Sequence, residues 1–319
     1  MADQRLARIA GRIAWMAVVA LAACTSAQPV RAGQFTGIVS FGDSLSDVGN
    51  TFLAAGLPPD PPYYQGRYSN GLNWLDYLAK DLGIAGPVAS LAGGSDYAWG
   101  GAQTGDGLSF MGTPNIGMQV DGFLMAGGTL TGSQLVTIWG GANDFLNAGL
   151  TDPAVAVANL SAAITKLAAA GASQFIVPNL PLLGELPVTN TLPDAVRQAL
   201  DGLTMAFNAM LAQELTKLDA TLGITIHQLD IATVFQEMLA DPSKYGLTNV
   251  TDSALDSGNF TGAGYLFWDN VHPTTSVQER IGHAAAATVI PEPSSLALLA
   301  IGGCAVVPML RPRARRRAA

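Results

Sequence analysis

Cysteine is nearly absent from this chain of 319 residues, which contains only Cys24 and Cys304. Both lie in terminal segments, so residues 33–290 contain no thiol. That stretch can therefore form no disulfide, and it has no cysteine nucleophile and no cysteine metal ligand. Exported proteins can fold without disulfides, so this absence does not argue against export.

Basic residues are also scarce in the middle of the chain. Nine of the 16 lysines and arginines, but only two of the 24 aspartates and glutamates, lie before residue 33 or after residue 290. The middle stretch keeps seven basic and 22 acidic residues, a formal charge near -15. Such a surface repels nucleic acid and anionic membranes, so nucleic-acid partners are not expected. Hydrophobic residues make up 49% of the chain, which is enough for a sizeable core.

The first 32 residues have the pattern of a signal peptide. Three arginines precede an apolar run at residues 13–23, and residues 30–32 (VRA) provide a small-x-Ala cleavage site. Residues 21–24 (LAAC) also match a lipobox, in which Cys24 would be lipidated, and this alternative stays open. The pattern predicts that the chain is exported.

The C-terminal segment, residues 291–319, combines three features. The triplet Pro-Glu-Pro is followed by a short apolar stretch at residues 294–310 and by five arginines within residues 311–317. As a helix the apolar stretch would be about 25 Å long, which is marginal for a bilayer core, and the arginines would stay on the cytoplasmic side. The segment resembles the PEP-CTERM sorting signal, which implies a processing protease as partner; an ordinary single-span anchor is the alternative. Either interpretation puts residues 33–290 outside the cytoplasm, at the cell surface, in the periplasm or secreted.

Between the two terminal segments, short β-prone runs alternate with segments of helical periodicity. The predicted strands are residues 38–41, 135–139, 175–178 and 224–229, and the predicted helices are residues 74–82, 154–170, 194–222 and 276–287. Two glycine-rich stretches, residues 92–107 and 112–132, are interpreted as long loops. The alternation predicts one α/β domain with a parallel sheet between two helical layers, a three-layer α/β/α sandwich. Ligands bind such sheets at the carboxyl ends of the strands, which is where Ser44 and Asn143 fall.

Four short blocks carry the residue types that acyl-transfer chemistry needs. They are FGDSLSD at residues 41–47, DYAWGGA at 96–102, GAND at 141–144 and DNVHP at 269–273. Together they supply a nucleophile, a base, a residue to orient the base and oxyanion donors. In this order the blocks resemble the GDSL (SGNH) family of serine esterases and lipases. The likeness runs from about residue 35 to residue 283 and implies a flavodoxin-like SGNH hydrolase fold.

Ser44 is the candidate nucleophile, although an isolated serine in a strand-to-helix turn is more often a turn residue or helix N-cap. A serine hydroxyl needs a base. The chain has three histidines; His227 lies in a predicted strand and His283 on the last predicted helix, which leaves His272. Asp269, three residues earlier, is placed to hold the imidazole nitrogen that faces away from Ser44. The family uses the same Asp-x-x-His arrangement, so the resemblance implies the catalytic residues Ser44, Asp269 and His272.

Gly101 and Asn143 are the oxyanion-hole candidates, together with the backbone N–H of Ser44. A glycine lets a backbone N–H approach a substrate closely, and a side-chain amide also donates. As ordinary structural features, the glycines would form a turn and Asn143 would cap a helix. The family's second-block glycine matches Gly101, although a shift to Gly100 stays open. Asp96 departs from the family, which usually has asparagine there, and leaves the local hydrogen bonding open.

The resemblance implies a serine ester hydrolase that forms an acyl-enzyme, and no cofactor or metal is expected because no cluster has ligand spacing. The expected substrates are carboxylic esters of lipids or acylated carbohydrates. The alternatives are acyl transfer or polysaccharide deacetylation at the same site, or a non-catalytic surface or matrix protein. The loops at residues 103–132 and 245–267 are expected to shape the substrate pockets. Four apolar residues are candidates for an acyl site, although apolar loop residues more often only pack: Met111, Met118, Phe123 and Met125.

Overall fold

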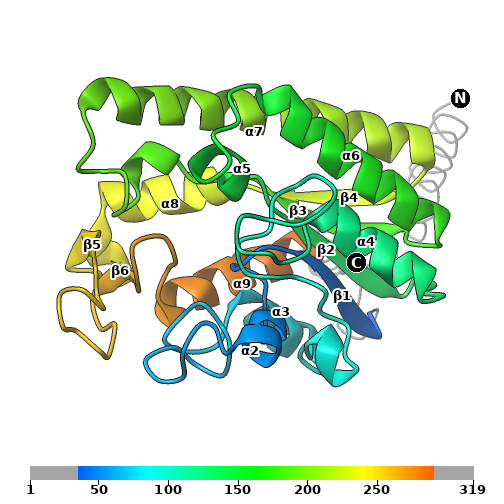
Figure 1. The fold of residues 1–319 in the computed structure, drawn as a ribbon, viewed down its shortest axis with the longest axis horizontal. Helices are drawn as coiled ribbons and strands as arrows, with labels where there is room; N and C mark the ends of the chain where they lie inside the picture. Colours follow the sequence, from blue (N-terminus) through cyan, green and yellow to red (C-terminus); the bar gives the residue numbers. More distant parts are fainter. Residues whose placement is uncertain (1–34, 291–319) are drawn as a thin grey trace, which may run out of the picture. The chain divides into compact units, whose positions relative to one another are not determined.

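The computed structural model describes residues 35–290, which contain a parallel sheet between two layers of helices (Figure 1). The sheet consists of β1 (Gly37–Gly42), β2 (Gln134–Trp139), β3 (Gln174–Pro178) and β4 (Thr225–Leu229), in this order and all parallel. The longer helices are α3 (Trp74–Leu82), α4 (Ile116–Met125), α6 (Pro153–Ala169), α7 (Asp194–Leu222), α8 (Ile231–Ala240) and α9 (Thr275–Val289). The short elements are α2 (Asn50–Ala55), α5 (Ala142–Leu146), the 3-10 helices η1 (Ser90–Ala92), η2 (Leu183–Glu185) and η3 (Pro242–Tyr245), and the paired strands β5 (Asn249–Ser253) and β6 (Tyr265–Phe267).

The layers agree with the architecture predicted from the sequence. Figure 1 shows α6 and α7 on one side of the sheet and α3 and α9 on the other. The predicted three-layer α/β/α sandwich with a central parallel sheet is therefore confirmed. Within the described residues, no helix is both long and apolar enough to cross a bilayer. The predicted signal peptide (residues 1–32) and sorting signal (residues 291–319) lie outside the described residues.

The four predicted strands and four predicted helices are all present, with ends that differ by one or two residues at most. Nearly every residue of β1, β2 and β3 is buried, as expected for parallel strands that are covered on both faces. The helix α3 starts at a capping box, in which Asn73 accepts from the N–H of Asp76 and Asp76 accepts from the N–H of Asn73. It ends at Gly83, which adopts a left-handed conformation with a φ of 69°.

The interpretation of residues 112–132 as a loop was wrong, because α4 lies inside this stretch. Its core-facing residues are Ile116, Val120 and Phe123, which follow helical spacing. Glycine usually argues against a helix, but Gly117 is favoured here, since a Cβ at this position would lie 2.9 Å from the backbone oxygen of Gly105 and would overlap the side chain of Asp106. Gly117 thus lies where α4 approaches the loop at residues 105–106, and not in a flexible segment as the glycine-rich sequence suggested.

Candidate active site

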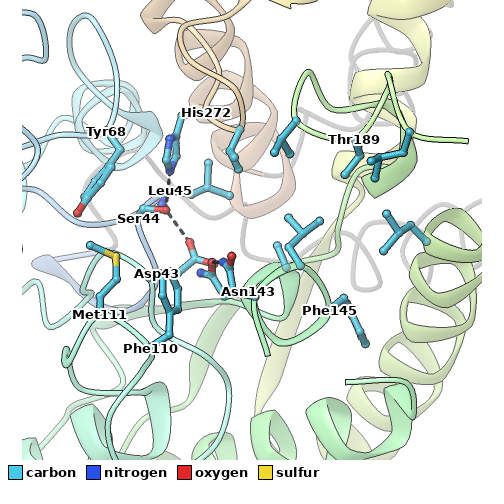
Figure 2. Close-up of a pocket in the computed structure, with 18 residues that line it drawn as sticks. Asp43, Ser44, Leu45, Tyr68, Phe110, Met111, Asn143, Phe145, Thr189 and His272 are labelled. Carbon is cyan, nitrogen blue, oxygen red and sulfur yellow. Dashed lines mark hydrogen bonds between the residues drawn. The ribbon is translucent and has the colours of Figure 1, made fainter. Parts of the chain in front are cut away.

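The carboxyl ends of β1 and β2 bring two of the predicted residues to one edge of the sheet. Ser44 follows the last residue of β1 by two positions, and Asn143 lies in α5, shortly after β2. Gly101 and His272 reach the same edge from a loop and from a turn after β6. All four residues line one cavity of about 420 Å³ (Figure 2). Sequence blocks that lie far apart in the chain thus meet at a single site.

Ser44, His272 and Asp269 form a continuous hydrogen-bonded chain. The Oγ of Ser44 lies 2.7 Å from Nε2 of His272. On the other side of the ring, Nδ1 lies 2.7 Å from Oδ2 of Asp269 and 3.0 Å from Oδ1. Because a carboxylate accepts at Nδ1, that nitrogen carries the proton and Nε2 is left to accept from the serine hydroxyl. This order of groups is that of a nucleophile, a base and a residue that orients the base.

The turn that contains Asp269 and His272 holds both side chains in place. Oδ1 of Asp269 accepts from the backbone N–H groups of Val271 (2.8 Å) and His272 (2.7 Å). Burial acts to raise the pKa of Asp269, but the charge of His272 and these hydrogen bonds outweigh it and lower the pKa to about 2. Burial acts to lower the pKa of His272, but Asp269 raises it overall. Asp269 is thus ionised at neutral pH and stabilises the protonated imidazole that a proton transfer creates.

Two backbone N–H groups at the cavity, those of Ser44 and Gly101, have no acceptor within the described part of the chain. The amide of Asn143 also lines the cavity, and its orientation is fixed because Nδ2 donates to the carbonyl of Ala102 (3.0 Å) and Oδ1 accepts from Asn147 (2.7 Å). An amide nitrogen has two N–H bonds, so one remains for the cavity. Three donors of this kind can bind an oxygen that gains negative charge.

The structure distinguishes Gly101 from its neighbour Gly100. The N–H of Gly100 donates to Oδ2 of Asp47 (3.0 Å) and to Oγ1 of Thr51 (2.8 Å), so it is not available to a substrate. Gly101 has a φ of 76°, and a Cβ at this position would lie 2.6 Å from Sδ of Met111. The positive φ favours glycine at this position, and a larger residue would also displace Met111. Of the two glycines that the sequence left open as oxyanion donors, Gly101 is therefore the one with an available N–H.

Two tyrosines with no role predicted from the sequence contact the base and its carboxylate. The hydroxyl of Tyr63 donates to Oδ2 of Asp269 (2.7 Å). The ring of Tyr68 packs against the ring of His272 with 5.0 Å between centroids, and a Cβ at Gly100 would overlap the Tyr68 hydroxyl. Tyr68 therefore lies between the base and the loop that carries the oxyanion candidate. The only signal in the sequence was that both tyrosines lie within residues 35–283, over which the chain resembles the family.

Asp43 is a second buried carboxyl at the cavity, next to the candidate nucleophile (Figure 2). The residue is 1% exposed, and its Oδ1 accepts from the N–H of Leu45 (3.0 Å). Burial raises the pKa of Asp43 to about 7, although the Leu45 hydrogen bond and the charge of His272 act in the opposite direction. The site thus contains one carboxyl with a lowered pKa, Asp269, and one with a raised pKa, Asp43.

The four apolar residues expected to share an acyl site separate in the structure. Met111 lines the cavity, whereas Phe123 is buried in the core and Met118 and Met125 are exposed. The acyl-site hypothesis is wrong for these three because α4 turns Phe123 into the core and Met118 and Met125 towards solvent; for Phe123 the packing alternative holds. The loop at residues 245–267 was also predicted wrongly, since none of the described residues that line the cavity comes from it.

The other two histidines have different surroundings. His227 lies in β4 with Nε2 3.4 Å from Oε1 of Gln174, and burial lowers its pKa. His283 lies on α9 and is bonded to Asp81. His272 is thus the histidine that lines the cavity. Across residues 35–290, the His, Cys, Asp and Glu side chains form no group of three that could hold a metal ion.

The chain matches a known family over most of its length. The family described as GDSL-like Lipase/Acylhydrolase matches residues 38–285. The chain belongs to this family. The predicted enzyme class is thereby confirmed, and this GDSL hydrolase is a serine carboxylic ester hydrolase.

Relatives of the GDSL hydrolase include an acyltransferase and esterases. It is 28% identical over 306 residues to a phosphatidylcholine-sterol acyltransferase from Aeromonas hydrophila, covering 79% of this chain and 89% of that protein. It is 24% identical over 313 residues to the GDSL esterase/lipase At1g06990 from Arabidopsis thaliana, covering 77% of this chain and 86% of that protein. The solved structure of the aryl esterase from M. smegmatis covers 80% of this chain and 98% of its own, with 16% identity and a TM-score of 0.49.

Asp96, the departure of this GDSL hydrolase from the family pattern, is fully buried. Its Oδ2 accepts from the N–H of Val48 (2.9 Å) and its Oδ1 from the N–H of Ala98 (3.2 Å). Burial, followed by the charge of Asp47, raises the pKa of Asp96 well above its usual value. Burial thus disfavours charge on the Asp96 carboxyl, at a position where the family usually has an uncharged amide.

The Asp96→Asn substitution is expected to make the GDSL hydrolase more stable at alkaline pH. The folded chain holds the Asp96 proton more tightly than the unfolded chain, which loses it near pH 4, so this stabilisation is complete below that pH and is lost as the pH rises through the raised folded pKa. Asparagine does not titrate, so the variant has no such loss of stability as the pH rises. Urea unfolding of both proteins at pH 5 and pH 8 should show an advantage that grows with pH to about 1–3 kcal/mol. An equal difference at both pH values would contradict a raised pKa of Asp96 in the folded chain.

Proposed function

We propose that this GDSL hydrolase is an exported esterase or lipase that cleaves carboxylic esters of lipids or acylated carbohydrates through an acyl-enzyme on Ser44. The observation that carries the proposal is the hydrogen-bonded chain from Ser44 through His272 to Asp269. It lies beside two backbone N–H groups that have no acceptor in the described part of the chain. A nucleophile with an oriented base and oxyanion donors is what acyl transfer requires.

Acylation begins when Oγ of Ser44 attacks the carbonyl carbon and its proton passes to Nε2 of His272. The carbonyl electron pair moves onto oxygen, which accepts from the N–H groups of Ser44 and Gly101 and from the amide of Asn143. As this intermediate collapses, the bond to the alcohol oxygen breaks and His272 gives its proton to that oxygen. The alcohol leaves, and Ser44 carries the acyl group.

Water then attacks the acyl carbon while His272 takes one of its protons, and collapse releases the carboxylic acid and returns a proton to Ser44. A sugar or lipid hydroxyl in place of water would give a new ester. Hydrolysis and acyl transfer therefore share one site and differ in which acceptor reaches the acyl-enzyme. The acyltransferase among the relatives supports transfer as the alternative, and a product assay with added alcohol separates the two.

Export is the second part of the proposal. The basic and apolar pattern of residues 1–32 supports a signal peptide, and residues 291–319 resemble a PEP-CTERM sorting signal. Together these segments support a folded domain at residues 33–290 that acts at the cell surface, in the periplasm or outside the cell. A sorting protease would be its partner, and membrane contact would involve the terminal segments only.

A serine-directed fluorophosphonate tests the proposed nucleophile. The full chain should gain the mass of one phosphonyl group, located on Ser44 by peptide mass spectrometry, and should lose ester hydrolysis at the same rate. Phosphonylation depends on an activated hydroxyl, so Ser44→Ala should stay unlabelled. A folded parent chain that is neither labelled nor active on nitrophenyl esters would instead favour the non-catalytic surface protein.

A further inference from the structure

The cavity extends from Ser44 in two directions. Figure 2 shows Tyr68, Phe110 and Met111 on one side of Ser44, and Phe145 and Thr189 on the other. We name the first side the Tyr68 arm, formed by Tyr68, Phe110 and Met111. We name the second side the α5 arm. It contains Phe145 and Thr189, and we assign to it the apolar cavity-lining residues that neighbour these two in the chain or lie on the following helix α7: Leu146, Val188, Leu192 and Leu200.

The α5 arm is apolar and offers no unused hydroxyl. Its lining comes from α5, from the segment between η2 and α7, and from α7 itself. The hydroxyl of Thr189, its polar member, donates to the carbonyl oxygens of Leu183 (2.5 Å) and Leu186 (3.1 Å). Asn147, at the end of α5, donates through Nδ2 to Asn143 (2.7 Å). A sugar or hydroxylated group in this arm would lose hydrogen bonds to water and regain few, whereas an aliphatic chain would lose none.

The position of the base decides which part of an ester enters which arm. In the proposed mechanism His272 gives its proton to the leaving oxygen, so the alcohol must lie next to the imidazole ring. Tyr68 packs against that ring with 5.0 Å between centroids. The Tyr68 arm therefore adjoins the leaving group, and the acyl carbon chain points in the opposite direction.

We infer that the α5 arm is the acyl subsite, and that the substrates of this enzyme are esters of aliphatic acids longer than acetic acid. The inference rests on the proposed function and adds the substrate class. Each methylene group that enters an apolar subsite strengthens binding about fourfold. The preference for longer acyl chains should therefore rise steeply until the arm is filled.

Filling the α5 arm should shift the preference towards short chains. We would measure kcat/KM of the full chain for nitrophenyl acetate, butyrate, octanoate and laurate. Leu200→Trp on α7 and Leu192→Trp on the exposed segment before it each add bulk to the cavity. The ratio of octanoate to acetate should fall at least about tenfold in both variants, because the chain loses several methylene contacts. The second variant keeps the test decisive if repacking at Leu200 prevents folding.

A matched substitution on the same helix serves as control. Met205, on α7, is 63% exposed and does not line the cavity, so Met205→Trp should keep the parental chain-length profile. An unchanged octanoate-to-acetate ratio in both Leu200→Trp and Leu192→Trp would overturn the acyl assignment while the enzyme remains an esterase. A parent chain that hydrolyses none of the esters would overturn the proposed function itself, and the acyl assignment with it.

Discussion

Replacing Ser44 with alanine is expected to lower kcat/KM for ester hydrolysis by about 10⁶-fold. The hydroxyl is the atom that bonds to the acyl carbon, and the side chain is otherwise bonded only to Nε2 of His272 in the described structure. The loss should appear in kcat for nitrophenyl esters, because the variant retains the cavity and its oxyanion donors. Only the residual rate from binding and oxyanion stabilisation should remain.

The double variant Ser44→Ala/His272→Ala is the informative control for this prediction. The two residues act as one unit, so removing both should cost no more than removing Ser44 alone. Thermal unfolding of the single variant should match the parent, since the substitution removes one hydrogen bond at a half-buried position. If the fold-loss in the double variant equals the product of the two single losses, Ser44 and His272 do not act in the same step.

The Asp269→Asn substitution is expected to lower kcat by about 10⁴-fold. Asparagine can keep one oxygen for the backbone N–H groups of Val271 and His272, so the turn should survive. It replaces the acceptor at Nδ1 of His272 with a donor, which favours the wrong tautomer and removes the charge that stabilises the imidazolium. Steady-state assays with nitrophenyl acetate at saturating concentration would give the loss in kcat directly.

The pH profile distinguishes this loss from a general disturbance of the site. Asp269 raises the pKa of His272, and the base is inactive when protonated, so the acid limb of the parent profile reflects a raised pKa. In Asp269→Asn the acid limb should move to lower pH. Asp256→Asn is a matched control in the same region, because this exposed carboxyl accepts from Asn270 (2.7 Å) and does not line the cavity. A fixed acid limb in Asp269→Asn would argue against coupling between the carboxylate and the base.

Local sequence patterns were enough to predict the sheet and the long helices. They also placed Ser44 and Asn143 at the carboxyl edge of the sheet. Helical periodicity between Pro193 and Gly223 gave the limits of α7, and the end of β1 placed Ser44 at the carboxyl edge. The match of the four blocks to a family supplied the partners of Ser44. The hydrogen-bonded chain to Asp269 then follows from a three-residue spacing within one turn.

The walls of the site could not be predicted in the same way, because they depend on contacts between distant segments. Tyr63 reaches Asp269 across 206 positions in the chain, and nothing in the local sequence of either residue signals this. The α5 arm combines α5 with Leu192 and Leu200, which belong to another part of the chain. Apolar residues at such positions have no pattern that separates a substrate wall from ordinary packing.

The hydrogen bond between Ser44 and His272 joins residues 228 positions apart. During synthesis the ribosome adds Ser44, Gly101 and Asn143 long before it reaches Asp269 and His272. A nascent or truncated chain therefore has the nucleophile and the oxyanion donors but no base to activate the hydroxyl. We therefore expect no ester hydrolysis from a chain that ends before His272, and activity only when the domain is almost complete.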